Sequence, residues 1–174
     1  AILVAARHPE LVSKLVLVDP LCHEAPPDPG ARVAALPVIG GLVLKQLWGR
    51  ISFRAFFRRW LLAPGAQVPD SRIDHFYDLF SSPAARGAAL ATLRGMSDTR
   101  PVVAQTQRIE TPTLVVWGRA DRVYPAALGQ RLSREIRGAR FELLDTGHAP
   151  QEERPEAFAE VLRRFLAAER RERD

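Results

Sequence analysis

The feature that most constrains the fold is a unit that runs from Thr111 to Pro150. Two short apolar runs, at 113–117 and 140–144, are each followed by a polar loop, and a segment with helical periodicity separates them. Apolar runs without alternation are typical of strands that are covered on both faces, as in a parallel sheet. Parallel strands need a crossover, which is normally a right-handed helix. The unit therefore predicts an α/β fold with both loops at one edge of the sheet.

Each of these two loops contains a residue that suits proton transfer. Asp121 follows the first strand, and His148 follows the second strand 27 positions later. Open α/β sheets place their chemistry at this edge, where a carboxylate can orient an imidazole so that its other nitrogen acts as a general base. Taken singly, Asp121 could be a turn or helix-start residue and His148 a loop histidine. Their order and spacing favour a catalytic pair.

The motif P-T-L-V-V-W-G-x-x-D followed by G-H-x-P-x-x-E-x-P resembles the C-terminal part of the α/β-hydrolase family. The resemblance implies that Asp121 is the acid after the family's seventh strand and that His148 is the histidine after its eighth. It also implies that residues just after the acid line the pocket, so Val123 is a candidate for substrate contact. The chemistry of an acid, a base and a nucleophile needs no cofactor, and no metal ligands are expected.

Residues 1–20 are similar to the helix after that family's nucleophile elbow, together with its sixth strand at 15–18. In the family a G-x-S-x-G turn precedes this helix. The 174 residues contain no such turn, and the nearest match, Gly95–Thr99, lacks the second glycine. We therefore expect the nucleophile to lie roughly half a dozen positions before Ala1. The chain as given is then an inactive fragment of a hydrolase.

The remaining residues divide into a helical lid, 21–108, and a C-terminal core, 109–174, by the same resemblance. A group of aromatic residues on the lid could line an apolar substrate cavity or pack the lid onto the core, and its helical spacing favours packing. The aromatic residues in question are Phe53, Phe56, Phe57 and Trp60. Helices are expected over 33–48, 51–62, 70–80 (capped by Asp70 or Ser71), 84–96 and from 101 in the lid, and over 126–137 (ended by Gly138) and 156–168 in the core.

Three functional hypotheses remain open. The leading one is a serine-type hydrolase that cleaves an ester or related acyl bond of a small apolar molecule. The second keeps Asp121 and His148 but uses an aspartate nucleophile to open epoxides or carbon–halogen bonds. Epoxide opening usually needs lid tyrosines as hydrogen-bond donors, and the lid has only one tyrosine, Tyr77, which makes epoxide opening less favoured. The third is a non-catalytic fragment or binding protein of the same fold.

Composition excludes several other classes of protein. The net charge of +5 and the pI near 10.3 invite a nucleic-acid interpretation, but residues 109–174 are balanced and no Lys/Arg block occurs. No apolar run is long enough to span a membrane. The chain has one cysteine, Cys22, so it forms no intrachain disulfide. We expect a cytoplasmic protein that does not bind nucleic acid, and the oligomeric state stays open.

Two further expectations concern histidines and solubility. His8, His23 and His75 do not share metal-ligand spacing and are expected to be surface or packing residues.

The strands at 15–18, 113–117 and 140–144 should be neighbours, which leaves the first of them with an unpaired edge. Exposed apolar edges favour aggregation, so we expect the isolated chain to be poorly soluble.

Overall fold

The computed structural model describes residues 1–23, 49–95 and 98–168 of the chain. The helix expected over 33–48 lies outside the described residues. In the described part of the chain, no helix combines the length and the apolar character that crossing a membrane requires.

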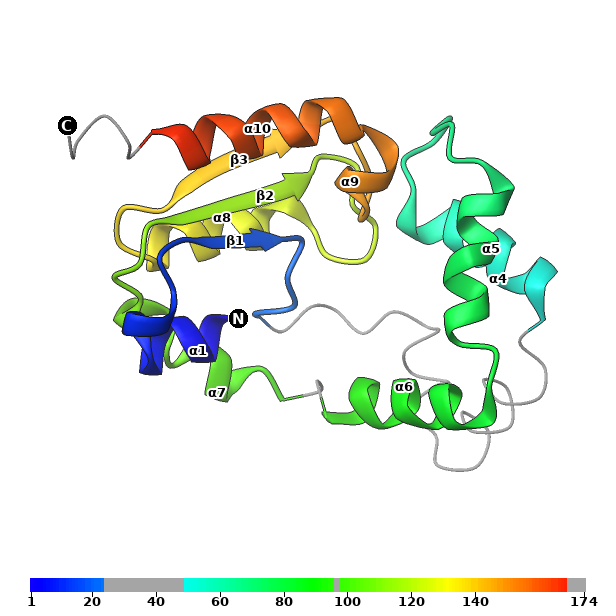
Figure 1. Ribbon diagram of the computed structural model, residues 1–174, viewed down its shortest axis with the longest axis horizontal. Helices are drawn as coiled ribbons and strands as arrows, with labels where there is room; N and C mark the ends of the chain where they lie inside the picture. The colour runs from blue at the N-terminus through cyan, green and yellow to red at the C-terminus, as the bar shows by residue number, and fades with distance from the viewer. Residues whose placement is uncertain (24–48, 96–97, 169–174) are drawn as a thin grey trace.

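Three strands in the described part of the chain form one parallel sheet (Figure 1). The strands β1 (Leu15–Val18), β2 (Thr113–Gly118) and β3 (Arg140–Leu144) lie in the order β1-β2-β3. Leu17 pairs with Val115, which in turn pairs with Phe141. The predicted parallel arrangement is therefore confirmed, and the loops after β2 and β3 leave the sheet at the same edge.

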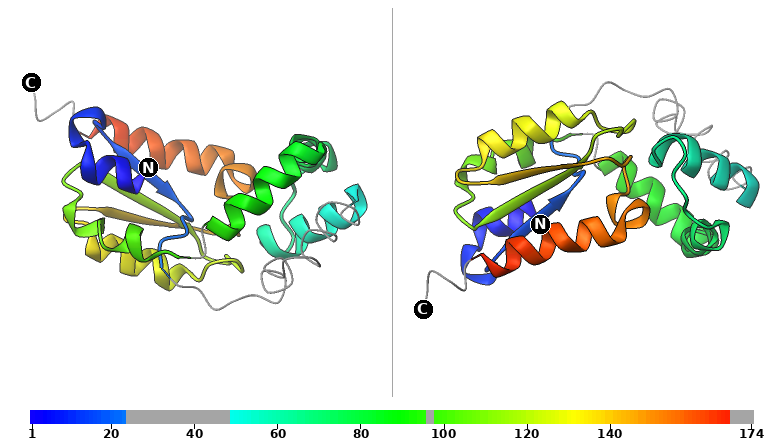
Figure 2. Two further views of the ribbon diagram at one scale, coloured as in Figure 1. Left: turned by 90° about the horizontal axis from the view of Figure 1, so that it is seen from below. Right: turned by 90° about the horizontal axis from the view of Figure 1, so that it is seen from above.

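Helices cover both faces of this sheet. The helices α8 (Ala126–Glu135) and α10 (Pro155–Ala167) lie on opposite sides of it (Figure 2). Successive side chains of a strand point to opposite faces, so in β2 the alternate residues Val115 and Trp117 pack with α8, whereas Leu114 and Val116 pack with α10. The short helix α1 (Ile2–Arg7) adds two buried side chains to the α8 cluster. Every residue of β2 is buried, as the apolar run predicts.

A group of helices lies beyond the carboxyl ends of the strands (Figure 1), and we call residues 49–95 the helical segment. It comprises α4 (Arg50–Phe56), a π-helical turn η3 (Phe57–Leu61), α5 (Asp70–Leu79) and α6 (Pro83–Gly95). The short helix α7 (Arg100–Val103) and the turn η4 (Thr106–Arg108) lead back to β2. Two more short elements, η1 (Pro9–Leu11) and α9 (Pro150–Glu153), precede β1 and α10.

Ion pairs on the surface hold α4 and η3 against α5. Arginines spaced four residues apart on one side meet aspartates with the same spacing on the other, and the Nε atom of Arg54 donates to Asp74 Oδ1 at 2.6 Å. The pairs are Arg50–Asp78, Arg54–Asp74 and Arg58–Asp70. Residues four apart share one face of a helix, so two such rows can interlock along the length of a helical hairpin.

Several helix boundaries differ from the sequence expectation. The expected helix over 51–62 changes to π-helical geometry at Phe57. Neither Asp70 nor Ser71 caps α5, because Asp70 is its first helical residue and Pro69 occupies the N-cap position. The helix expected from residue 101 has a single turn. Gly138, with φ +72°, lies in the turn that follows the cap of α8 at Ile136 rather than at the cap itself.

Candidate active site

The loop after β2 holds the carboxylate of Asp121 in a fixed orientation. The Asp121 side chain is fully buried. Its Oδ1 atom accepts hydrogen bonds from the backbone N–H groups of Val123, at 2.7 Å, and Tyr124, at 2.9 Å. An aspartate that bonds to backbone amides two and three positions ahead is a common way to stabilise a turn. Here the turn also leaves the second carboxylate oxygen, Oδ2, available to another group.

That group is the imidazole of His148, which the loop after β3 provides. His148 Nδ1 lies 2.9 Å from Asp121 Oδ2. A carboxylate oxygen only accepts, so Nδ1 carries the proton in this bond and the opposite nitrogen, Nε2, is the one that can accept a proton. The ring of Tyr124 packs edge-on against the imidazole, with 5.4 Å between ring centroids. The structure thus brings together the two residues that sequence spacing paired.

An apolar cavity of about 570 Å³ opens beside His148, between the helical segment and the end of the sheet. Aromatic side chains of the helical segment form much of its wall, and the His148 side chain, which is 22% exposed, is part of the lining. The phenylalanines that line it are Phe53, Phe56, Phe57, Phe76, Phe80 and Phe158. Phe53 and Phe57 also pack against the buried Ile73, so packing and cavity lining are not exclusive for these residues. Trp60 and Val123 are not among the residues that line this cavity.

A second buried carboxylate, Asp19, lies next to the pair, and the sequence analysis did not single it out. Asp19 follows β1, has φ +42° and is 5% exposed. Its Oδ1 accepts the N–H of Gly118 at 2.9 Å, and its Oδ2 is buried without a partner among the described residues. Burial raises the pKa of Asp19 to about 7, against the lowering effect of the Gly118 hydrogen bond, and the nearby Asp121 raises it further. One donor atom each from Asp19, Asp121 and His148 lie within 4.8 Å of one another, which is the one grouping of the described residues that could hold a metal ion.

Two of the other histidines, His8 and His23, contact acidic residues. His8 is exposed and lies 3.4 Å from Glu10. His23 is buried and hydrogen-bonded to Glu135 at 2.9 Å and to the thiol of Cys22 at 3.1 Å. Burial, followed by the charge of Glu135, raises the pKa of the Cys22 thiol to about 11. A protonated, buried thiol is a poor nucleophile, so this cluster does not resemble an active cysteine site.

Comparison with known proteins identifies the family of the chain. The sequence model of the alpha/beta hydrolase family matches residues 1–161, and the chain belongs to that family. It is 27% identical over 172 residues to a pimeloyl-[acyl-carrier protein] methyl ester esterase of Neisseria meningitidis, which covers 95% of this chain. It is 27% identical over 176 residues to a 2-hydroxymuconate semialdehyde hydrolase of Pseudomonas putida, covering 96% of this chain. The solved enol-lactonase of Burkholderia xenovorans superposes with a TM-score of 0.67 at 25% identity, over 95% of this chain.

The chain spans only part of the length of these relatives. It covers 53% of the esterase, 58% of the semialdehyde hydrolase and 60% of the enol-lactonase. The matched family and relatives make this chain a portion of an alpha/beta hydrolase fold, with its parallel sheet and covering helices.

Proposed function

We propose that the protein to which this chain belongs is a serine-type hydrolase that cleaves an ester or related acyl bond of a small apolar substrate. The observation that carries the proposal is the 2.9 Å hydrogen bond between His148 and Asp121, beside an apolar cavity that His148 helps to line. The names of the relatives support hydrolysis, and two of them, an esterase and a lactonase, name the cleavage of an ester bond.

In this reaction a serine hydroxyl attacks the carbonyl carbon of the ester, and Nε2 of His148 accepts the hydroxyl proton. The Nδ1–H group keeps its bond to Asp121, whose negative charge stabilises the imidazolium that forms. His148 then gives the proton to the departing alcohol, which leaves an acyl-enzyme. Water repeats the sequence and releases the acid. Asp121 and His148 supply the acid–base part of this cycle, and we propose that the serine lies outside these 174 residues.

The helical segment is proposed to act as the lid of this site. It contributes five of the six phenylalanines in the cavity wall, and it lies across the edge of the sheet where Asp121 and His148 meet. A cover of this kind limits the access of bulk water to the site and sets the shape of the acyl pocket. The aromatic wall favours an aromatic or extended aliphatic acyl group over a charged one.

The test begins with the DNA upstream of the codon for Ala1. A G-x-S-x-G sequence shortly before it supplies the expected nucleophile, and the extended protein should then hydrolyse p-nitrophenyl esters and react covalently with a fluorophosphonate. His148→Ala should abolish both activities. Asp145→Asn is the control, because Asp145 lies in the same loop but its side chain is exposed and pairs with Arg119. An aspartate at the elbow position, or an extended protein that reacts with neither probe, would refute the proposal.

A further inference from the structure

The motif that contains His148 also contains Glu153, and the acid–base chemistry gives this glutamate no role. Glu153 is the last residue of α9 and is partly buried. Its Oε1 accepts the backbone N–H of Gly147 at 2.7 Å, and its Oε2 accepts the backbone N–H of Ala63 at 2.9 Å. Burial raises the pKa of Glu153, and its bonds to backbone N–H groups oppose that effect. One carboxylate therefore joins Gly147, the residue before His148, to Ala63, which lies just after η3.

A second, independent contact joins the same two stretches of backbone. The N–H of His148 donates to the carbonyl oxygen of Leu61 at 2.6 Å. Gly147 lies so close to the helical segment that a Cβ atom on it would be 2.5 Å from Leu61 O and 2.6 Å from Ala63 N. No side chain separates the histidine loop from residues 61–63, so a shift of one backbone displaces the other.

We propose that Glu153 is a positioning residue, which fixes the backbone of Gly147 and thereby aims the His148 imidazole, and which ties that aim to residues 61–63 of the helical segment. As far as it concerns catalysis, the proposal rests on the function proposed above. A carboxylate suits this position, because its partners are backbone N–H donors and each needs an acceptor. A carboxylate that accepts from backbone amides makes stronger bonds than a neutral amide group does.

The neighbouring Glu152 does not share this role. Its carboxylate pairs with Arg72, with Nε 2.7 Å from Oε2, and Glu152 is part of the cavity lining. That ion pair links α9 to α5 through long side chains, one of which is half exposed. This pair joins two side chains, whereas Glu153 bonds directly to the backbone of two loops and so fixes their relative position.

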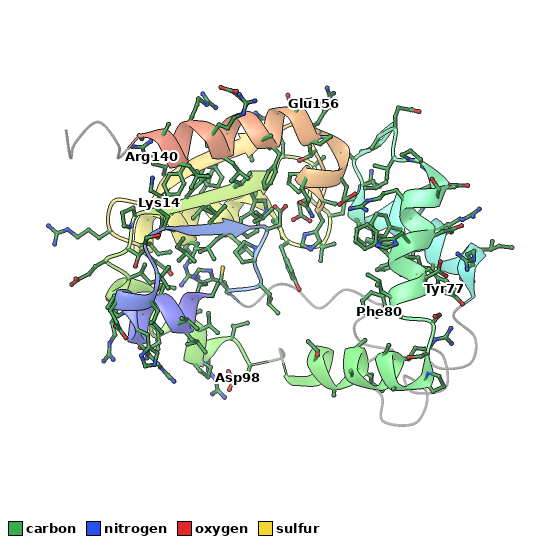
Figure 3. The ribbon with its side chains drawn as sticks, viewed as in Figure 1. Lys14, Tyr77, Phe80, Asp98, Arg140 and Glu156 are labelled. Atoms are coloured by element: carbon green, nitrogen blue, oxygen red, sulfur yellow. The ribbon has the colours of Figure 1, made fainter. Side chains whose placement is uncertain are left out.

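The decisive variant is Glu153→Gln, which keeps the shape of the side chain but replaces one acceptor oxygen by an NH₂ donor. One of the two backbone N–H groups must then face another donor. In the extended, active protein we expect kcat to fall about tenfold to a hundredfold, because small misplacements of a catalytic group have effects of this size, while KM changes about threefold or less. The control is Glu156→Gln, since Glu156 is exposed on α10 and points away from the sheet (Figure 3).

A second measurement does not depend on activity. In the unmutated chain the amides of Gly147 and Ala63 share Glu153 as acceptor, so their hydrogen exchange should be slow and should proceed with one common opening free energy. In Glu153→Gln, exchange at Gly147, His148 and Ala63 should accelerate together, with the thermal midpoint of unfolding shifted much less than the local protection.

The two proposals can fail separately. If the unmutated extended protein hydrolyses no ester, the proposed function fails, and the exchange measurement still decides whether Glu153 couples the two loops. Unequal protection of Gly147 and Ala63 in the unmutated chain would overturn the coupling. So would a Glu153→Gln protein with unchanged kcat and unchanged exchange at Gly147.

Discussion

The backbone N–H of Gly118 donates a 2.9 Å hydrogen bond to Oδ1 of Asp19, and this bond joins the ends of β1 and β2 beside the Asp121–His148 pair. The other oxygen of Asp19 has no partner among the described residues, and burial raises the pKa of this carboxyl group to about 7. The bond therefore fixes the position of the Asp19 carboxyl group, whose ionised form is destabilised by burial.

Asp19 should make the stability of the fold depend on pH. Its pKa rises from 3.8 in the reference state to about 7 in the folded chain, so the folded state binds more protons between these values. The free energy of unfolding should fall as pH rises through this window and level off above it. Asp19→Asn cannot ionise, and we expect it to be more stable than the unmutated chain by roughly 1–3 kcal/mol at about pH 8, and by much less at about pH 4. Urea unfolding of both proteins at both pH values measures this difference in the free energy of unfolding. A difference of the same size at the two pH values would contradict the prediction.

Asp121→Asn should impair catalysis without unfolding the protein. The amide can still accept the Val123 and Tyr124 N–H groups through one oxygen, but its NH₂ group then faces Nδ1 and favours the wrong tautomer of His148. In the extended protein we expect kcat to fall by roughly 10³–10⁴, the size of effect seen when a triad aspartate is made neutral. Steady-state kinetics with p-nitrophenyl esters check this, beside Asp145→Asn. A loss of less than about tenfold would exclude Asp121 as the acid.

Gly147→Ala should separate the histidine loop from the helical segment. The new Cβ would lie 2.5 Å from Leu61 O, a backbone atom that cannot rotate away. We expect a loss of stability of about 1–3 kcal/mol, typical of overpacking, and a lower kcat. Thermal unfolding and kinetics measure the two effects. Gly87→Ala is the control, because nothing lies within 4 Å of a Cβ at this helical position and the change should be neutral or slightly stabilising. An equal change in stability and kcat for the two variants would contradict the close approach of Gly147 to Leu61.

Phe76→Ala should change substrate preference. Phe76 stacks on Phe57, with 5.5 Å between ring centroids, and both rings line the cavity. Removing it enlarges the cavity and deletes apolar contact with a bulky acyl group, so kcat/KM for a phenylacetyl or hexanoyl ester should fall about tenfold or more, with a smaller change for acetate. Leu79→Ala on the same helix is the control, since Leu79 is exposed and is not part of the lining. A uniform loss for all chain lengths would argue against this cavity as the acyl pocket.

Cys22 should report global unfolding. It is 1% exposed, and burial raises the pKa of its thiol to about 11. We expect Ellman's reagent to react slowly with the folded chain and with one thiol per chain after unfolding in urea. The urea dependence of the labelling rate should follow the unfolding transition measured by circular dichroism. Complete labelling of the folded chain within minutes would show that this part of the core opens locally.

The parallel sheet and the meeting of Asp121 with His148 could be predicted because both depend on short-range pattern. Apolar runs mark the strands, and the order of strand and loop brings both residues to one edge. Asp19 escaped notice because its partner, Gly118, is 99 positions away and offers only a backbone amide. Glu153 was visible in the motif, but its partners are again backbone groups, which no side-chain pattern reveals.

The interlocking of α4 with α5 could have been predicted. Arg50, Arg54 and Arg58 repeat every fourth residue, and Asp70, Asp74 and Asp78 repeat with the same spacing after a loop that contains Pro64-Gly65. Two complementary rows separated by a turn indicate a helical hairpin closed by ion pairs. The π-helical turn at Phe57–Leu61 has no comparable signal in the sequence.

The backbone contact between Gly147 and residues 61–63 determines where the helical segment can hinge. A cover that swung open about the end of η3 would carry the histidine loop with it and dismantle the acid–base pair. If the segment is the lid proposed above, it should stay anchored at residues 61–63, and substrate should enter by movement of the parts farther from this point, such as the outer ends of α4 and α5. In the proposed enzyme, the cavity could then open while His148 keeps its hydrogen bond to Asp121.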